Sequence, residues 1–183
     1  MHALGALVPV LAEATSKPLV MISLAIVTGL YVMSEVLRLK GKPLPLITAF
    51  TLMMGRRDET EHFVTRPAYF ALGIIASLLL FPTDIAYASI TVVAVGDPAA
   101  SYIGGSFGHT HIGSKTLEGF AAGMAASFAA ASLWVSPGLA LVGSGAGMLL
   151  ELIGRVDDNL TMPIGAGAMM TLASILKTAT GGM

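Results

Sequence analysis

The sequence of 183 residues contains no cysteine and very little charge. Without cysteine the chain cannot form disulfides, thiolate metal sites or a cysteine nucleophile. Charged residues make up 11% of the chain, against about a quarter in soluble globular domains. The net charge of -1 provides no basic surface for nucleic acid, so no nucleic-acid partner is expected. Apolar residues are 55% and the mean hydropathy is +0.80, which excludes an ordinary soluble domain and predicts an integral membrane protein.

Long apolar segments predict a single all-α domain over residues 1–183, a polytopic membrane bundle of about seven transmembrane helices. A helix that crosses the hydrocarbon core needs about 20 mostly apolar residues, with a range of roughly 17 to 25. The amino-terminal segment lacks the charged region and the cleavage site of a secretory signal, so we expect it in the mature chain. The predicted spans are Ala3–Ala14, Pro18–Leu39, Pro67–Phe81, Ile85–Ile103, Leu117–Val135, Gly138–Ile153 and Leu160–Leu176.

Basic residues gather in alternate connections between these spans. The longer polar connections are Lys40–Arg66, Gly104–Thr116 and Gly154–Asn159, which share one side of the membrane in a seven-span arrangement. Together with Arg38, that side carries 8 of the 10 Lys and Arg residues. By the positive-inside rule the sequence predicts that this side is cytoplasmic.

The stretch "VVAVGDPAASYIGGSFGHTHIGSKTLEG" (residues 92–119) starts apolar and then becomes polar and rich in glycine. Asp97 lies about one turn before the end of the apolar run, where a carboxylate is costly unless it is paired, hydrated or bound to a cation. The next glycines permit positive φ and a close backbone approach to a ligand. These are Gly104, Gly105, Gly108 and Gly113.

The same stretch ends with a serine, a lysine and a threonine before the next apolar span. Ser114 or Thr116 can cap that helix, so that its first N–H groups point at the loop. A helix start with a glycine-rich approach and Lys115 suits phosphate, although the spacing is not that of a P-loop. A flexible loop that merely tolerates glycine is the alternative.

The late segment "GRVDDNLTMPIG" (residues 154–165) places two carboxylates and an amide between two apolar spans. Asp157, Asp158 and Asn159 carry hard oxygen ligands that suit Mg²⁺. The alternative is a turn that caps the last helix, with Thr161 as the cap. The segment shares its face with Asp97 and Lys115, which favours a metal site with Asp97 as a further ligand.

Two other features carry weaker signals. Glu35 and Arg38 lie three residues apart on one helix face, so they form an ion pair or position a substrate, with equal weight. His109 and His111 lie in a loop without carboxylate neighbours, which is weak evidence for a metal.

These motifs together resemble the CTP-dependent polyprenol and lipid kinase family, which includes dolichol kinase, phytol kinase and CTP-dependent diacylglycerol kinase. The likeness covers most of the chain. It rests on "GDPAASYIGGSFG" (96–108), "KTLEG" (115–119) and "DDNLTMP" (157–163), with support from "SEVLR" (34–38).

The resemblance implies an enzyme that transfers the γ-phosphate of CTP to the hydroxyl of a membrane isoprenoid alcohol or diacylglycerol, with Mg²⁺ as cofactor. It implies catalytic roles for Asp97 and Lys115, metal binding by Asp157, Asp158, Asn159 and Asp97, and an active site on the cytoplasmic face. The nucleotide- and phosphate-binding residues would be Gly96, Ser101, Gly104, Gly105, Gly108, Ser114, Lys115, Thr116, Glu118 and Gly119.

The family also carries a basic pair shortly before a histidine at the start of its first span. His2 matches this histidine and would position substrate together with Glu35 and Arg38. The pair itself either precedes this start or is replaced by another basic residue such as Arg38.

Three other functions compete with a kinase. A CTP-using cytidylyltransferase that makes a CDP-lipid shares the "GD…G…KTLEG" pattern, but its later signature is missing here. A small ion-coupled transporter would carry polar residues to the bilayer midplane and show repeat symmetry, whereas these charges cluster at one face without a repeat. A non-catalytic scaffold ranks last.

Overall fold

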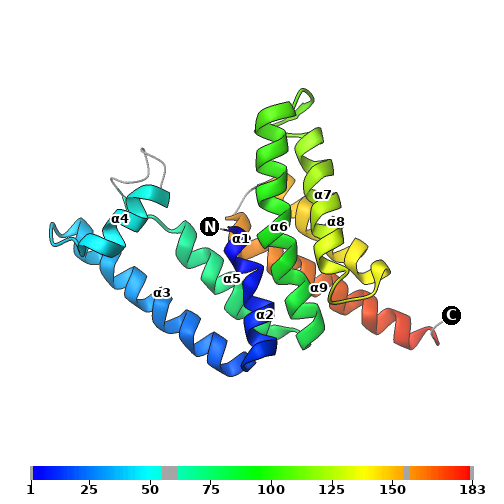
Figure 1. Ribbon diagram of the computed structural model, residues 1–183. Helices are drawn as coiled ribbons and strands as arrows, with labels where there is room; N and C mark the ends of the chain where they lie inside the picture. Colours follow the sequence, from blue (N-terminus) through cyan, green and yellow to red (C-terminus); the bar gives the residue numbers. More distant parts are fainter. Residues whose placement is uncertain (1, 55–61, 155–156, 182–183) are drawn as a thin grey trace.

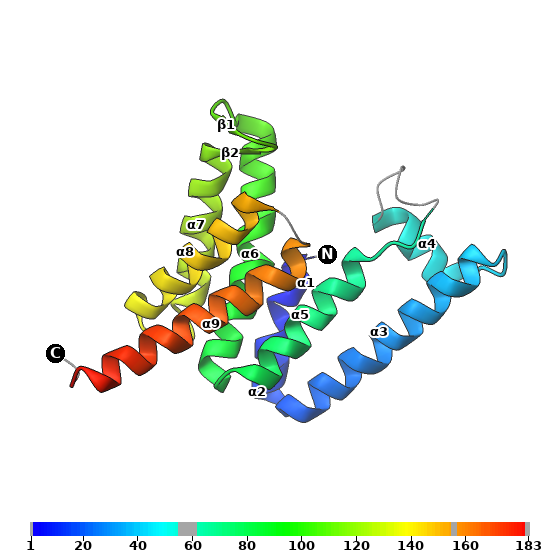
Figure 2. The same ribbon diagram turned by 180° about the vertical axis from the view of Figure 1, so that it is seen from behind.

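The computed structural model describes residues 2–54, 62–154 and 157–181 (Figures 1 and 2). Two strands of two residues each, β1 (His111–Ile112) and β2 (Lys115–Thr116), pair antiparallel in a hairpin, and the rest of the regular structure is helical. The predicted all-α class is therefore confirmed. The helices are α1 (His2–Gly5), α2 (Leu7–Ala14), α3 (Lys17–Leu39), α4 (Pro45–Met54), α5 (Arg66–Leu80), α6 (Thr83–Phe107), α7 (Leu117–Ala131), α8 (Pro137–Ile153) and α9 (Asp158–Ala179).

Each predicted span corresponds to helical structure, although the first is divided into α1 and α2. The prediction of a polar connection over Lys40–Arg66 is wrong in its middle, where α4 forms. This helix is an apolar run of ten residues that starts with proline, which is favourable at the first position of a helix. It is hidden in the sequence because basic residues flank it on both sides.

The central element is α6, which packs against α7, α8, α9, α5 and the short α1. Every residue from Ile85 to Ala94 is buried. A helix that is apolar and buried all round occupies the core of a bundle. The structure extends α6 to Phe107, beyond the predicted end at Ile103, so that Gly104 and Gly105 belong to the helix rather than to the loop.

Small residues at every fourth position form the contact between α6 and α7. On α6 and its C-cap these are Gly96, Ala100, Gly104 and Gly108, and on α7 they are Gly119, Gly123, Ser127 and Ala131. A Cβ atom on Gly119 would lie 2.7 Å from the carbonyl oxygen of Ala100, and one on Gly104 would lie 2.7 Å from Oγ1 of Thr116. Small residues allow such a close approach of two helix backbones. We call these two rows the small-residue seam.

Of the four glycines expected to permit positive φ, Gly113 is the one that adopts it. Gly113 has φ of 64°, whereas Gly108 has φ of −74° and Gly104 and Gly105 are helical. Gly104 and Gly108 were expected to allow a close backbone approach to a ligand; in the structure both lie close to Thr116, and Gly108 also lies close to the carbonyl oxygen of Gly104.

Helices α3 and α4 form an arm beside the bundle, which α3 contacts mainly through α5 and α2 (Figure 1). By length and composition, α3 and α9 are apolar enough to cross a membrane. Helices α5, α7 and α8 are also apolar but contain only 15, 15 and 17 residues.

Candidate functional site

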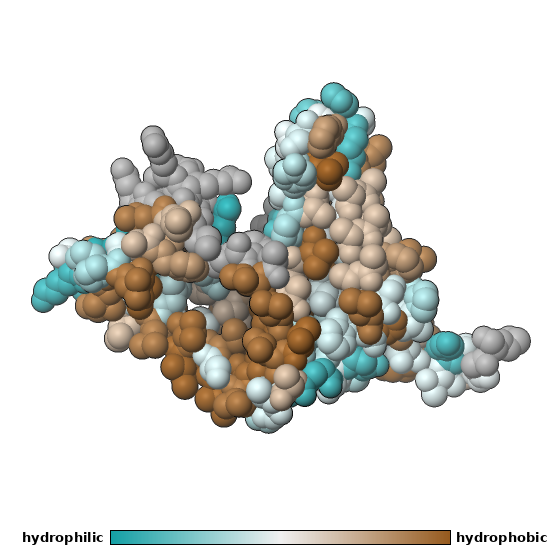
Figure 3. Space-filling view, in the orientation of Figure 1, coloured by the Kyte–Doolittle hydropathy of each residue, from teal (hydrophilic) through white to brown (hydrophobic). Residues whose placement is uncertain are grey.

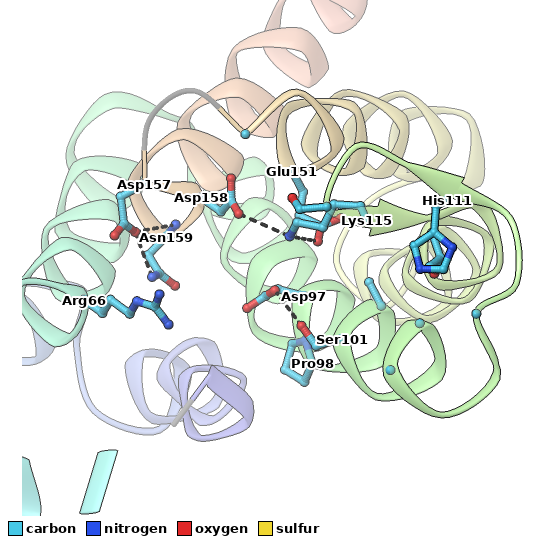
Figure 4. Close-up of a pocket in the computed structure, with 17 residues that line it drawn as sticks. Arg66, Asp97, Pro98, Ser101, His111, Lys115, Glu151, Asp157, Asp158 and Asn159 are labelled. Carbon is cyan, nitrogen blue, oxygen red and sulfur yellow. Dashed lines mark hydrogen bonds and ion pairs between the residues drawn. The ribbon is translucent and has the colours of Figure 1, made fainter. Parts of the chain in front are cut away.

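A polar pocket of about 1080 Å³ lies at the end of the bundle that carries the hairpin (Figure 4). It collects residues from α5, α6, the hairpin, α8 and the start of α9. The predicted site residues that line it are Asp97, Ser101, Gly104, Gly105, Gly108, Ser114, Lys115, Thr116, Asp157, Asp158 and Asn159. Residues separated by more than 60 positions in the sequence therefore meet in one pocket.

Lys115 lies at the centre of the charge network in this pocket. The hairpin register pairs Lys115 with Ile112, which fixes the lysine backbone above α6. Its ammonium donates to the carboxylate of Glu151 on α8 and lies 3.5 Å from Oδ2 of Asp158. Burial lowers the pKa of Lys115, but the hydrogen bond to Glu151 and the charges of Glu151, Asp158 and Asp97 outweigh it and raise the pKa above 10.5. The side chain therefore remains a cation at neutral pH.

Asp97 lies on the floor of the pocket, on the same helix as Ser101. The Ser101 hydroxyl donates to Oδ1 of Asp97 over 3.4 Å, one turn away on α6. Asp97 is close enough to Lys115 and Asp158 for its charge to raise the pKa of both groups. Asp97 on α6, Lys115 on the hairpin and Asp158 on α9 therefore line the same pocket, as the sequence predicted.

The start of α7 uses its own N–H groups within the protein. Thr116 caps the helix and accepts from the N–H of Gly119 over 3.2 Å, while the N–H of Leu117 donates to the carbonyl of Thr110. Glu118 accepts from the N–H of Thr110 and ties the hairpin to α7. The start of α7 therefore has fewer free N–H donors for a phosphate than the sequence suggests. Lys115 is the cation closest to this helix start in the pocket lining.

The start of α9 separates the two adjacent aspartates. Asp157 caps the helix in place of the expected Thr161, and its Oδ1 accepts from the backbone N–H and the amide Nδ2 of Asn159. Asp158 points to the other side, toward Lys115 (Figure 4). The turn is therefore both a helix cap, as in the alternative interpretation, and a wall of the pocket.

Two oxygen atoms at this turn are buried without a hydrogen-bond donor. They are Oδ1 of Asp158 and Oδ1 of Asn159, and the Asn159 residue is only 6% exposed. Buried acceptors of this kind are costly unless a donor or a cation meets them. Both are hard oxygen ligands of the type that Mg²⁺ takes.

A complete metal cage is not preformed. Within residues 2–54, 62–154 and 157–181, no group of three or more His, Asp or Glu side chains converges as a metal site. Asp157 turns away to cap α9, so the predicted set of Asp97, Asp157, Asp158 and Asn159 does not act as one cluster. Asp158 and Asn159 fit Mg²⁺ as two protein ligands, with substrate phosphates and water completing the shell.

Several predicted site residues lie outside the pocket lining. Gly96 and Gly119 belong to the small-residue seam, and Glu118 braces the hairpin. Glu35 and Arg38 form the expected ion pair at 2.8 Å, on α3 beside the chain that leads into α5. The backbone of His2 is in α1, while its side chain is outside the described part of the structure.

The pocket also contains residues that were not predicted. Arg66 enters from the first turn of α5, Glu151 comes from the last turn of α8, and His111 lies on β1. Glu151 is 2% exposed in an otherwise apolar helix. A carboxylate near the end of an apolar run is costly, so the sequence could have indicated Glu151 for the same reason as Asp97. No comparable pattern in the sequence points to Arg66.

Comparisons of the chain with models of known protein families, with curated proteins and with solved structures found no match.

Proposed function

We propose that the protein is an integral membrane kinase that transfers the γ-phosphate of CTP to the hydroxyl of a lipid alcohol. In this proposal the seven predicted segments span the bilayer and the polar pocket faces the cytoplasm. The observation that carries the proposal is the convergence of Asp97, Lys115 and Asp158 in one pocket of an otherwise apolar helix bundle. The choice of CTP rests on the sequence resemblance to the CTP-dependent lipid kinases.

The charge of the pocket favours a nucleotide that arrives with a divalent cation. Four carboxylates face two basic side chains, so the lining has a formal charge of −2 with His111 neutral. A bare triphosphate would be repelled by such a lining. Bound Mg²⁺ would neutralise charge on the phosphate oxygens, and Asp158 and Asn159 are the residues that would hold it.

In the proposed reaction, Lys115 and Asp97 have different roles in phosphoryl transfer. Such reactions ask a protein mainly to position the reactants and to stabilise charge on the phosphate oxygens. Lys115 exchanges part of its contact with Glu151 and Asp158 for a phosphate oxygen. The alcohol oxygen attacks the γ-phosphorus while the bond to the β-phosphate oxygen breaks, and CDP leaves. Asp97 accepts the alcohol proton, because it is the carboxylate on the floor of the pocket.

The test uses purified protein in lipid with Mg²⁺ and CTP labelled separately at the γ- and α-phosphates. We expect γ-label in an alcohol chosen from geranylgeraniol, phytol, dolichol and diacylglycerol, and we expect Asp97→Asn to abolish it. Phosphatidic acid serves as the acceptor for the rival chemistry. Label from the α-phosphate in a CDP-lipid would identify a cytidylyltransferase, and label in neither product would reject both enzymes.

A further inference from the structure

A second, apolar cavity of about 300 Å³ lies beside the polar pocket, between α1–α2, α3, α4 and α5. Its walls include Leu4, Val8, Val27, Phe50, Phe70 and Ile74. We call it the α5 groove. None of the residues that line the polar pocket lines this groove. The proposed reaction requires a binding site for the hydrocarbon tail of the alcohol.

Among the residues that line the α5 groove, no hydroxyl has its proton free to donate to an occupant. Thr28 and Tyr31 are the polar side chains in its lining. The Thr28 hydroxyl donates to the carbonyl of Leu24 over 2.7 Å, and the Tyr31 hydroxyl donates to the carbonyl of Val64 over 2.6 Å. A polar ligand would lose its own hydrogen bonds on entry without replacement, so the groove suits a hydrocarbon.

Helix α5 joins the groove to the polar pocket. Arg66, its first residue, lines the pocket, and Pro67, the next residue, lines the groove. Ala71 and Ile74 continue the groove on later turns, about 10 Å further along the helix at 1.5 Å per residue. An elongated molecule can therefore lie along α5 with one end at Arg66 and the rest among apolar side chains.

The far side of the groove faces the apolar surface of the arm. Helix α3 is long and apolar enough to span a membrane, and it exposes Ile22, Ile26 and Val27. Figure 3 shows apolar side chains gathered over α2 and α3, whereas the hairpin end of the bundle is a mixture of polar and apolar side chains. A tail that leaves the groove past α3 would continue in lipid rather than in water.

Arg66 follows a hydrogen-bonded clasp between α3 and the chain before α5, which we define as Tyr31, Glu35 and Arg38 on α3 with the backbone of His62 and Val64. The N–H of Val64 donates to Oε2 of Glu35 over 3.1 Å, and Nη2 of Arg38 donates to the carbonyl of His62 over 2.6 Å. Glu35 is fully buried. The clasp fixes the chain two residues before Arg66, whose side chain points toward Asp157 and Asn159, across the pocket from Lys115 (Figure 4).

Building on the proposed function, we propose that the acceptor is a single-chain lipid alcohol whose tail lies in the α5 groove with its hydroxyl beside Arg66. The nucleotide then occupies the hairpin side of the pocket near Lys115. The groove has about ten times the volume of a water molecule in the liquid, which is room for one chain segment. The guanidinium of Arg66 is planar and permanently charged, and such a group can form two parallel hydrogen bonds to one phosphate. It therefore suits the transferred γ-phosphate.

The kinetic test fills the groove and compares the two substrates. We expect Ala71→Trp to raise the KM for geranylgeraniol at least tenfold while the KM for CTP stays within twofold. The matched control is Leu72→Trp, because Leu72 is the next residue of α5, is 46% exposed and lies outside the groove lining. An unchanged KM for the alcohol in a folded Ala71→Trp protein would overturn the proposal, as would equal kcat/KM for diacylglycerol and geranylgeraniol.

A photolabelling experiment tests whether the alcohol binds in the α5 groove, and it does not depend on enzymatic turnover. A long-chain isoprenoid alcohol with a photoreactive diazirine in its tail is irradiated with the protein in lipid vesicles, with and without excess geranylgeraniol. We expect competed labelling of peptides from α3 and α5, and its loss in Ala71→Trp. If this labelling occurs without phosphate transfer, the kinase proposal fails and the groove stands. Uniform labelling of all lipid-facing helices, or labelling that excess alcohol does not reduce, would reject the groove.

Discussion

Lys115 connects the hairpin with the end of α8 and the start of α9, which follow it by more than 30 positions in the sequence. It carries the charge that the proposed reaction needs for a phosphate, and it also neutralises Glu151, which is almost completely buried. A buried carboxylate that loses its partner is strongly destabilising. Replacement of this lysine should therefore affect both activity and folding, and a second variant is needed to separate the two effects.

We expect Lys115→Met to lower kcat/KM for CTP roughly 100-fold or more, as the loss of a charged group at a phosphoryl site does. It should also destabilise the protein by about 1 to 3 kcal/mol, because Glu151 is left without its partner. Thermal unfolding in detergent and γ-phosphate transfer are the two measurements.

The double variant Lys115→Met with Glu151→Gln is the control. It should regain most of the lost thermal stability, since the neutral amide no longer requires a cation, but it should not regain activity. Recovery of activity in the double variant would show that Lys115 acts only by neutralising Glu151.

At the scale of single residues, the sequence predicts much of the pocket. Asp97, Lys115 and Asp158 could be identified because charges are rare in this chain and each lies close to one end of an apolar span. The separation of Asp157 from Asp158 could not be predicted, because the cap geometry decides which of two adjacent carboxylates faces the pocket. Arg66 could not be identified either, since its place depends on a contact between α3 and the segment before α5.

The contact of α6 with α7 depends on the absence of side chains. In the sequence the glycines between residues 96 and 123 suggest both a loop and helix packing, and only the structure shows that packing explains most of them. The helix boundary decides this point, because Gly104 lies in α6 and contacts Thr116 across the seam. The lengths of the apolar runs located the helices but did not define their last turns.

We expect Gly119→Ala to destabilise the protein by about 1 to 3 kcal/mol, the usual cost of overpacking. Its added Cβ would meet the carbonyl oxygen of Ala100 at 2.7 Å and Cα of Gly104 at 3.0 Å, and both are backbone atoms that cannot rotate away. Thermal unfolding is the measurement.

Gly145→Ala is the matched control, because an added Cβ there meets only Cε of Met124 at 3.7 Å. Gly145 lies inside α8, so alanine should leave stability unchanged or raise it by up to about 1 kcal/mol. Equal destabilisation by both substitutions would argue against close packing as the reason for the glycines.

The clasp links α3 to the segment before α5. Its removal should lower the stability of the protein. We expect Glu35→Gln to destabilise the protein by about 3 kcal/mol, because Arg38 then keeps its charge beside a neutral amide in a buried place. Phosphate transfer to geranylgeraniol should fall with it, since Arg66 follows directly after the clasp. Glu13→Gln, at an exposed position, should change stability by less than about 0.5 kcal/mol. If Glu35→Gln lowers stability but leaves transfer untouched, the clasp does not position Arg66.

At the scale of the whole molecule, the proposed topology places the polar pocket and the α3–α4 connection on the same side of the membrane. The chain contains no cysteine, so a single introduced cysteine is the only thiol that a reagent can find. We expect Ser114→Cys and Lys42→Cys to react with a membrane-impermeant maleimide from the cytoplasmic side of intact vesicles. Ser136→Cys should react from the opposite side, and reaction of all three from one side would reject the seven-span arrangement.

The unequal helix lengths have a consequence for the surrounding bilayer. Helices α5 and α7, at 15 residues each, extend about 22 Å at 1.5 Å per residue, less than the roughly 30 Å of a typical hydrocarbon core. Helix α3, with 23 residues, is long enough to cross it with some tilt. In the proposed seven-span topology the bundle would thin the bilayer beside α7, whereas the short α5 packs against the longer α3.

In the proposed topology, the clasp would couple the tilt of α3 to the position of Arg66. The 23 residues of α3 are exposed over most of their surface, and the carboxyl-terminal end of this helix grips the backbone two residues before Arg66. A change in bilayer thickness that alters the tilt of α3 would pull on this grip and shift Arg66 relative to Lys115. The thickness of the host membrane would then set the spacing between the two cations, and with it the rate at which they engage one phosphate.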